Sequence, residues 1–300
     1  MNSTSNRLIF GCGYLGRRVA RRWLQEGHRV HAVTRFPARA AEFLREGIEP
    51  HVADITDPGS LRQLPEATTV LFAVGFARGS SNTIDDVFVE GLRNVLNLLP
   101  AAERFIHISS SGVYGQQNGL WVDESSPCRP VRAGGRACLG AEQLLMRHAQ
   151  GQRAVVLRLA GLYGPGRIPR RDDLLRGVPI AAPATGFLNL IHVDDAVDTV
   201  LAAEQLAPVP RLYLVSDGTP VPRRHYFAEL ARQLGAAEPR FITPDPNNHS
   251  AARAMSNKRI RNQRLRDELK VRLSFPSYVD GLAAILGDTS SAGDIERPNG

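Results

Sequence analysis

Residues 8–16 read Leu-Ile-Phe-Gly-Cys-Gly-Tyr-Leu-Gly and contain the spacing GxGxxG at positions 11–16. The apolar run Leu8–Phe10 predicts a strand, and residues 15–26 carry apolar side chains at helical spacing. A glycine pattern placed directly between a strand and a helix indicates the phosphate-binding turn of a Rossmann domain. We therefore expect this stretch to begin such a domain and to bind a dinucleotide.

Each glycine of this turn has a distinct mechanical task. Gly11 permits the tight turn, Gly13 leaves space for a pyrophosphate, and Gly16 lets the helix pack close to the strand. The helix N-terminus adds free N–H groups and a partial positive charge. The residues of the turn that we expect to bind the cofactor are Gly11, Cys12, Gly13, Tyr14, Leu15 and Gly16.

Short apolar runs alternate with segments of helical period along most of the chain. The predicted strands are Leu8–Phe10, Arg29–Val33, Val70–Val74, Phe105–Ile108, Val155–Leu159 and, rejoining the sheet, Arg211–Val215. The predicted helices are 15–26, 37–46, 87–98, 136–149 and 194–204. Repeated strand and helix in this order favour right-handed crossovers, and so predict an α/β fold with a doubly wound parallel sheet.

After residue 164, glycines and prolines break the chain into loops, which indicates a smaller C-terminal substrate lobe. Within it, the sequence predicts an amphipathic helix over 224–234 and a charged helix over 258–269. The predicted division is a Rossmann domain over 1–165 with 192–217 returning to it, a small lobe over 166–191 and 218–287, and a disordered tail over 288–300.

The end of the second predicted strand bears on the choice between NADP and NAD. A carboxylate there would accept hydrogen bonds from the adenosine ribose of NAD, but residues 32–35 read Ala-Val-Thr-Arg. The guanidinium of Arg35 suits a 2′-phosphate, so NADP is the expected cofactor and NAD the alternative. Two other interpretations stay open. In the first, Arg35 is a solvated loop charge. In the second, Arg17 or Arg18 shares the phosphate with it.

Composition argues against several classes of protein. The 300 residues are 43% hydrophobic, enough for a large core. The net charge of +7 comes from arginines scattered along the chain, with lysine only at Lys258 and Lys270, so no nucleic-acid partner is expected. No apolar run approaches the ~20 residues that span a bilayer, so no membrane anchor is expected.

The cysteines Cys12, Cys128 and Cys138 have no CxxC spacing and no neighbouring histidine cluster. This pattern argues against structural zinc and against a disulfide framework, so no metal site is predicted. A reducing cytoplasm is the expected location.

Several stretches resemble, in order, blocks of the extended short-chain dehydrogenase/reductases, the superfamily of the nucleotide-sugar epimerases and dehydratases. Residues 52–55 resemble the block whose Asp contacts adenine, and residues 72–75 resemble a loop that lines the cofactor. The resemblance implies further cofactor contacts from Asp54, Ile55, Ala73, Val74 and Gly75. Residues 109–115 resemble the motif SSxxVYG, which gives Ser110 the place of the catalytic serine or threonine.

The main catalytic pair of that superfamily, YxxxK, is absent. Aligning the following helix puts Gly134 at the tyrosine position and Cys138 at the lysine position. Both lysines lie beyond residue 257, so no change of register recovers the pair. A serine hydroxyl alone is a poor proton donor near neutral pH. The chain therefore resembles an atypical branch of the superfamily, similar to NAD-dependent epimerases and dehydratases.

Replacement groups can be sought near the expected site. Tyr163 and Arg167, in a YGPGR loop, are candidates for proton transfer or for binding a substrate anion. Arg132 and Arg136 are candidates for binding a substrate phosphate or carboxylate, or the phosphate on the nicotinamide side, and equally for a solvated surface.

Other polar residues near these motifs are expected to be structural. His192 is expected to pack behind the site, and Asp194 and Asp195 to cap the following helix. A lowered thiol pKa near a helix start is one reading of Cys138, and a small buried side chain is the other.

Two functions fit these features. The first is an NAD(P)-dependent oxidoreductase or epimerase of a small, sugar-like or anionic substrate, using Ser110, Tyr163 and a non-standard acid or base. The second is a non-catalytic sensor that binds NADP(H). The helices predicted at 87–98 and 136–149 correspond to those that form a dimer interface in the superfamily, so a homodimer is expected by resemblance.

Overall fold

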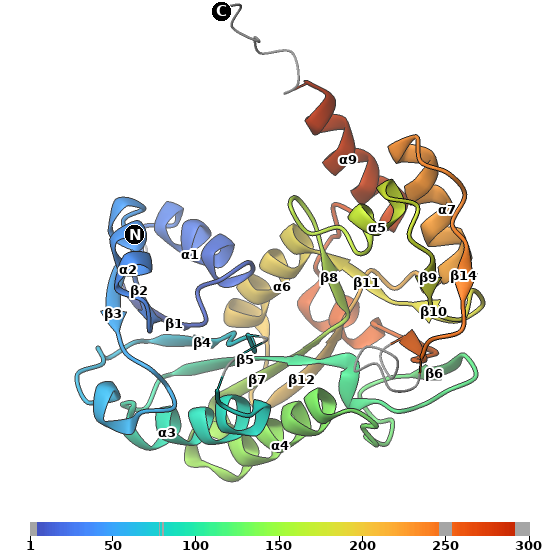
Figure 1. Cartoon of the computed structure of the whole chain (residues 1–300). Helices are drawn as coiled ribbons and strands as arrows, with labels where there is room; N and C mark the ends of the chain where they lie inside the picture. Colours follow the sequence, from blue (N-terminus) through green and yellow to red (C-terminus); the bar gives the residue numbers. More distant parts are fainter. Residues whose placement is uncertain (1–4, 78, 80, 246–253, 292–300) are drawn as a thin grey trace, which may run out of the picture.

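Seven parallel strands form the centre of the computed structural model, which describes residues 5–77, 79, 81–245 and 254–291 (Figure 1). From one edge to the other they are β12 (Arg211–Val215), β7 (Ala154–Leu159), β5 (Arg104–Ser110), β4 (Thr69–Phe72), β1 (Asn6–Phe10), β2 (Arg29–Thr34) and β3 (Glu49–Val52). Each neighbouring pair is parallel. The predicted doubly wound α/β fold is confirmed, including the return of Arg211–Val215 to the sheet.

Helices cover both faces of this sheet (Figure 1). On one face lie α1 (Gly16–Gln25), α2 (Pro37–Arg45) and α6 (Val193–Leu206), and on the other lie α3 (Gly91–Leu98) and α4 (Ala133–Arg147). Alternate side chains of a strand point to opposite faces. Accordingly Ile9 packs into the core between the sheet and the helices α1 and α6, which we call the first core. Leu8 and Phe10 pack into the core between the sheet and the helices α3 and α4, the second core.

The edge strand β3 was not predicted. Its four residues, Glu-Pro-His-Val, are half-buried or exposed, and Pro50 interrupts the apolar pattern. Proline is tolerated on an edge strand because one side of that strand has no ladder to complete. A half-solvated strand of this kind carries little hydrophobic signal in the sequence.

The smaller lobe lies to the right of the sheet in Figure 1 and has a third core, in which Tyr226, Leu230 and Leu282 are fully buried. The predicted amphipathic helix is present as α7. The elements of this lobe are β8 (Gly161–Tyr163), α5 (Arg171–Leu175), β9 (Ile180–Ala181), β10 (Phe187–Leu188), β11 (Leu190–His192), β13 (Val221–Pro222), α7 (Arg223–Leu234), β14 (Phe241–Ile242) and α9 (Tyr278–Ser291).

The charged helix predicted over 258–269 is wrong for its first five residues. Residues Lys258–Ile260 form the strand β15, which pairs in parallel with β6 (Leu120–Val122). The chain is helical only over 263–269, where Leu265–Leu269 make a wide helical turn. Lys258 and Ile260 are both buried, which is the period of a strand and not that of a helix.

The predicted disordered tail over 288–300 is also corrected in part. Helix α9 continues through Ser291, because its buried residues Leu282 and Ile285 anchor it on the third core. The remaining residues of the predicted tail, 292–300, lie outside the described part of the chain.

A buried ion pair ties α4 to the sheet. The Arg158 guanidinium on β7 donates to the Glu142 carboxylate on α4 at 2.9 Å, and both side chains are 6% exposed. Ser109 on β5 donates to the same carboxylate, and Arg158 also donates to the Tyr114 hydroxyl. This network joins β5, β7 and α4 directly beside Ser110.

Replacing Glu142 by alanine should destabilise the fold by about 3 kcal/mol or more, because Arg158 would remain as a buried, unpaired charge. Urea unfolding at pH 7 measures this change. The exposed pair Glu90–Arg93 provides a control, and Glu90→Ala should leave the unfolding midpoint nearly unchanged. Equal effects of the two substitutions would contradict a structural role for the buried pair.

Candidate functional site

The glycine turn follows β1 at the carboxyl edge of the sheet. Gly11 has φ +85°, and a Cβ there would lie 2.3 Å from the carbonyl oxygen of Ala73. A Cβ on Gly16 would lie 2.6 Å from the Gly11 carbonyl oxygen. Around the position of a Cβ on Gly13, by contrast, no described atom lies within 4 Å. Two glycines therefore permit close backbone contacts, and Gly13 borders open space.

Helix α1 begins beside this open space with an uncapped N-terminus: Leu15 precedes it without a side-chain cap, and its first turn holds no acidic residue. Such a helix end presents N–H groups and a partial positive charge. Arg17 pairs with Glu42 of α2 and with Glu46, the residue that follows this helix. Arg18 donates to the Tyr14 carbonyl at 2.8 Å and lies 4.2 Å above its ring.

Arg35 stands at the carboxyl end of β2. Its side chain is exposed, and its guanidinium lies 4.9 Å from the centre of the Phe36 ring, which is itself 50% exposed. Within the described residues no ion pair engages Arg35, in contrast to Arg17. A cation over an exposed aromatic ring is well placed to receive an anionic group from solution.

The loops after β3 and β4 reach the same edge. Asp54 Oδ1 accepts hydrogen bonds from the N–H and hydroxyl of Thr56, so this carboxylate shapes its own loop. Ile55 is buried against Gly91, where a Cβ would lie 2.7 Å from its side chain. After β4, Val74 packs partly against the second core, and Gly75 would present a Cβ to open space.

Ser110 is the last residue of β5. Its Oγ accepts a hydrogen bond from the Gly112 N–H at 3.0 Å, which leaves its own hydroxyl proton to donate elsewhere. A Cβ on Gly112 would lie 3.1 Å from this Oγ and 2.9 Å from Nη2 of Arg132. The Arg132 guanidinium therefore lies beside Ser110, and burial lowers the pKa of this side chain.

Glycine and cysteine occupy the start of α4, where the resemblance places tyrosine and lysine. A Cβ on Gly134 would make only an ordinary contact, 3.5 Å from Ile84. Gly135 lies against the turn after β5, since its Cβ would be 2.3 Å from the Gly112 carbonyl oxygen. Partial burial raises the pKa of the Cys138 thiol to about 11, so this half-buried side chain is a neutral thiol at pH 7.

Tyr163, predicted as a candidate catalytic residue, lies in the core of the smaller lobe. Its side chain is fully buried, and its hydroxyl donates to the Ser277 carbonyl oxygen at 3.5 Å. A Cβ on Gly281 of α9 would collide with the same hydroxyl. Burial also raises the pKa of Tyr163. The hydroxyl is covered by the C-terminal segment, so the structure favours a packing role for Tyr163 over the predicted catalytic one.

His192 and the acidic pair after it are structural as well. His192 Nδ1 accepts a hydrogen bond from the Asp194 N–H and so caps α6 itself, the role expected of the aspartates. Its ring lies 3.9 Å from that of Phe275. The Asp195 carboxylate instead accepts hydrogen bonds from the N–H groups of Ser274 and Phe275. These contacts anchor the C-terminal segment.

One buried charged residue escaped the sequence analysis. Lys258 on β15 is 5% exposed, whereas the sequence predicted a charged helix there. The sequence signal that would have identified it is the alternation of Lys258 and Ile260 on one face of a strand.

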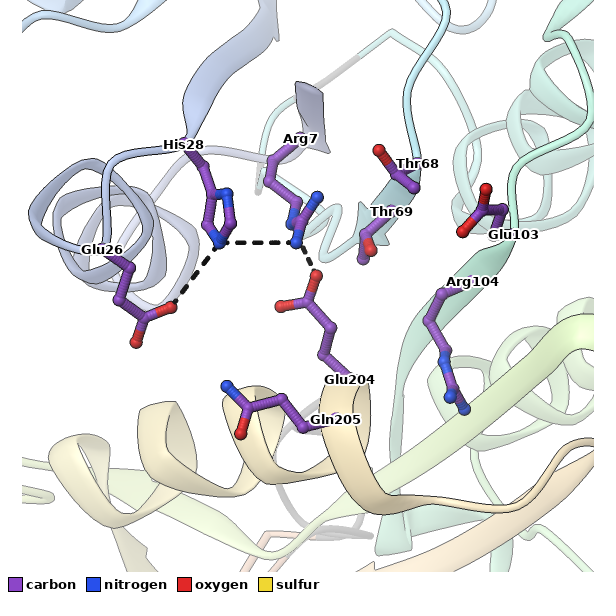
Figure 2. Close-up of a pocket in the computed structure, with 9 residues that line it drawn as sticks. All are labelled: Arg7, Glu26, His28, Thr68, Thr69, Glu103, Arg104, Glu204 and Gln205. Carbon is purple, nitrogen blue, oxygen red and sulfur yellow. Dashed lines mark hydrogen bonds and ion pairs between the residues drawn. The ribbon is translucent and has the colours of Figure 1, made fainter. Parts of the chain in front are cut away.

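A separate hollow of about 330 Å³ lies at the opposite, amino edge of the sheet (Figure 2). Arg7 and Glu204 form an ion pair of 2.5 Å within it, and His28, in the connection between α1 and β2, contacts Arg7 (Figure 2). Trp23 also donates to Glu204. These charged groups satisfy one another, and they lie away from the glycine turn, so this hollow belongs to the packing of α1 and α6.

The described residues contain no cluster of three or more histidine, cysteine, aspartate or glutamate side chains able to hold a metal ion. None of the helices that the structure describes is both long and apolar enough to cross a membrane.

This chain is similar to known proteins in sequence and in fold. The sequence model of the NAD dependent epimerase/dehydratase family matches residues 8–215. Protein YeeZ of Escherichia coli K12 is 26% identical over 242 residues, covering 78% of this chain and 85% of YeeZ. A Methylobacillus flagellatus structure is 30% identical, with a TM-score of 0.75, covering 96% of this chain and 100% of its own.

The fold is shared more widely than the sequence. The Bordetella bronchiseptica enzyme WbmG in complex with NAD superposes with a TM-score of 0.79 at 19% identity, covering 97% of this chain and 96% of WbmG.

Cys12 and Cys138 should resist alkylation in the folded protein. Burial raises the pKa of Cys138 to about 11 and that of Cys12 to about 12, so at pH 8 their thiolate fractions are at least about 100-fold below that of an ordinary cysteine. Mass spectrometry after iodoacetamide treatment should show slow labelling of both until urea is added. Cys138→Ser identifies the signal, and rapid native labelling of Cys138 would instead indicate an activated thiol.

Proposed function

Because the chain belongs to the NAD dependent epimerase/dehydratase family, within the extended short-chain dehydrogenase/reductases, we propose that it is an NADP-dependent oxidoreductase. Its substrate is a small molecule, sugar-like or anionic, that reacts at a hydroxyl or carbonyl carbon. The observation that carries the proposal is the open space at Gly13 in front of an uncapped helix N-terminus, next to Ser110 on the same edge of the sheet.

The cofactor would lie along the carboxyl edge of the strands. Its pyrophosphate fits the space at Gly13 and the N–H groups of α1. Arg35 would bind the 2′-phosphate of NADP, with NAD as the alternative. The loop positions assigned to the adenine and nicotinamide portions of the cofactor are Asp54, Ile55, Ala73, Val74 and Gly75.

The residues around Ser110 would orient the substrate and stabilise charge. A bound nicotinamide supplies or accepts a hydride. The Ser110 hydroxyl, whose oxygen already accepts from Gly112, donates to the substrate oxygen. The nearby guanidinium of Arg132 favours negative charge as it develops on that oxygen. Proton transfer then needs a donor other than a YxxxK tyrosine, such as a water molecule.

A second candidate function, a sensor of NADP(H) without turnover, is favoured by the missing proton relay. Lysine is absent before residue 258, and Gly134 offers no side chain where a tyrosine would act. The position of Arg132 beside Ser110 favours the enzyme, because cofactor sensing needs neither group.

Cofactor choice can be tested by titrating the protein with NADPH and NADH and following fluorescence. Arg35→Ala should weaken NADPH binding by about 10-fold or more and leave NADH binding unchanged, because only the 2′-phosphate loses a charge-assisted partner. Gly13→Val should abolish binding of both. Arg39→Ala, which removes a neighbouring exposed arginine, is the matched control. Equal affinities of the Arg35→Ala variant and the unmodified protein for NADPH would argue against the assignment.

Turnover separates the enzyme from the sensor. NADPH oxidation, monitored over a panel of aldehydes, ketones and nucleotide sugars, should identify a substrate whose kcat falls by about 100-fold in Ser110→Ala. The adjacent substitution Ser111→Ala should leave kcat nearly unchanged. Tight NADPH binding with turnover that is insensitive to Ser110 would contradict the proposed role of this serine. Tight binding without turnover across the panel would favour the sensor.

A further inference from the structure

Lys258 is a cation in a position that normally holds an apolar residue. Its side chain is 5% exposed and points to the same side of β15 as Ile260, which is fully buried in the first core. Buried lysines are rare in proteins unless a partner neutralises them. The Nζ of Lys258 donates to the neutral hydroxyl of Ser256 at 3.2 Å. No carboxylate within the described ranges forms an ion pair with it.

The backbone around Lys258 holds this side chain in place. β15 pairs with β6 through the register Lys258↔Leu120 and Ile260↔Val122. On its other side, Asn189 donates to the Lys258 carbonyl oxygen at 2.9 Å and accepts from the Ile260 N–H at 2.7 Å. The strand pair and the Asn189 amide therefore fix the backbone from which the buried Lys258 side chain projects.

A second cation, Arg132, interacts electrostatically with Lys258. Burial, and after it the positive charge of Arg132, lower the pKa of Lys258 to about 8. Burial also lowers the pKa of Arg132, which has no ion pair with any residue that the structure describes. Lys258 is buried and Arg132 is half-buried, and two such like charges without a counter-charge repel one another. Such an arrangement is relieved by a bound anion.

The position of Arg132 relates this cation pair to the reacting group. Nη2 of Arg132 and Oγ of Ser110 both lie within 3.1 Å of one point, the place of a Cβ on Gly112. We propose that Arg132 and Lys258 together bind a carboxylate or phosphate group of the substrate, whose reacting oxygen lies on Ser110. This inference rests on the proposed function and narrows its substrate to an anion.

The test compares thermal unfolding at pH 7 in sodium chloride, inorganic phosphate and acetate at equal ionic strength. For the unmodified protein, phosphate or acetate at about ten times its Kd should raise the unfolding temperature by about 3 °C. A response to phosphate alone assigns a phosphate group, and a response to acetate a carboxylate. The absence of either response overturns the proposal.

Substitution distinguishes a binding site from a structural lysine. Lys258→Met should lose the anion response and, in chloride, unfold at a higher temperature than the unmodified protein, because the repulsion is removed. Arg132→Met should lose the same response. Lys270→Met, which changes the other lysine of the chain, an exposed one, should keep it. A Lys258→Met variant that unfolds earlier and keeps the anion response would overturn the proposal.

Titration of these variants with NADPH separates this inference from the function on which it rests. Both Lys258→Met and Arg132→Met should bind NADPH as tightly as the unmodified protein. A loss of NADPH affinity of 10-fold or more in both would assign the cations to the cofactor phosphate and overturn the substrate site. If the unmodified protein responds to the anion but does not bind NADPH, the proposed function fails while the anion site stands.

Discussion

The close approach of β1 and β4 at Gly11 is the constraint on which the candidate site depends. Strand order reverses between these neighbours, because β2 and β3 follow on one side and β5, β7 and β12 on the other. The loops that leave the two strands therefore diverge and open a crevice at their carboxyl ends. Backbone alone fits between them at Gly11, since the Ala73 carbonyl oxygen occupies the space of a Cβ. The open space at Gly13 follows from this packing.

A second region of the site is held by α4. The first turn of this helix lies against the turn after β5 through Gly135, and the Glu142–Arg158 pair fixes its middle to β7. The helix thus keeps the position in which the superfamily places its catalytic pair, while its own side chains there are small. Arg132, the N-cap residue of this helix, brings charge to Ser110 instead. The fold of the family is therefore compatible with a different set of side chains at this position.

The positive charge around the site depends on which arginines and lysines have acidic partners more than on the net charge of the chain. Arg17 and Arg22 on α1 have acidic partners on α2 and α6, so they add little free positive potential. Arg132 and Lys258 have no such partner in the described part of the chain. A net charge of +7 by itself suggested scattered solvated arginines. The arrangement of partners leaves Arg132 without an ion pair beside Ser110, within the residues that the structure describes.

Local sequence determined the features that arise from near neighbours in the chain. The glycine spacing after Leu8–Phe10 predicted the turn, and the alternation of strands and helices predicted the doubly wound sheet, because strand period, turn and helix period are all local properties. The return of Arg211–Val215 to the sheet was predicted from its apolar run, whereas the order of the strands came from the structure. In contrast, β3 was missed because half-solvated edge strands carry little apolar signal.

Tertiary structure alone decided the residues whose environment comes from distant segments. Tyr163 resembles a reactive tyrosine in its motif, but residues from the C-terminal segment cover its hydroxyl. The sequence predicted a charged helix at Lys258. The structure pairs residues 258–260 with Leu120–Val122, more than 130 residues earlier, so Lys258 is a buried strand residue. Burial and charge pairing depend on which segments meet in space, and a single sequence does not contain that information in any local pattern.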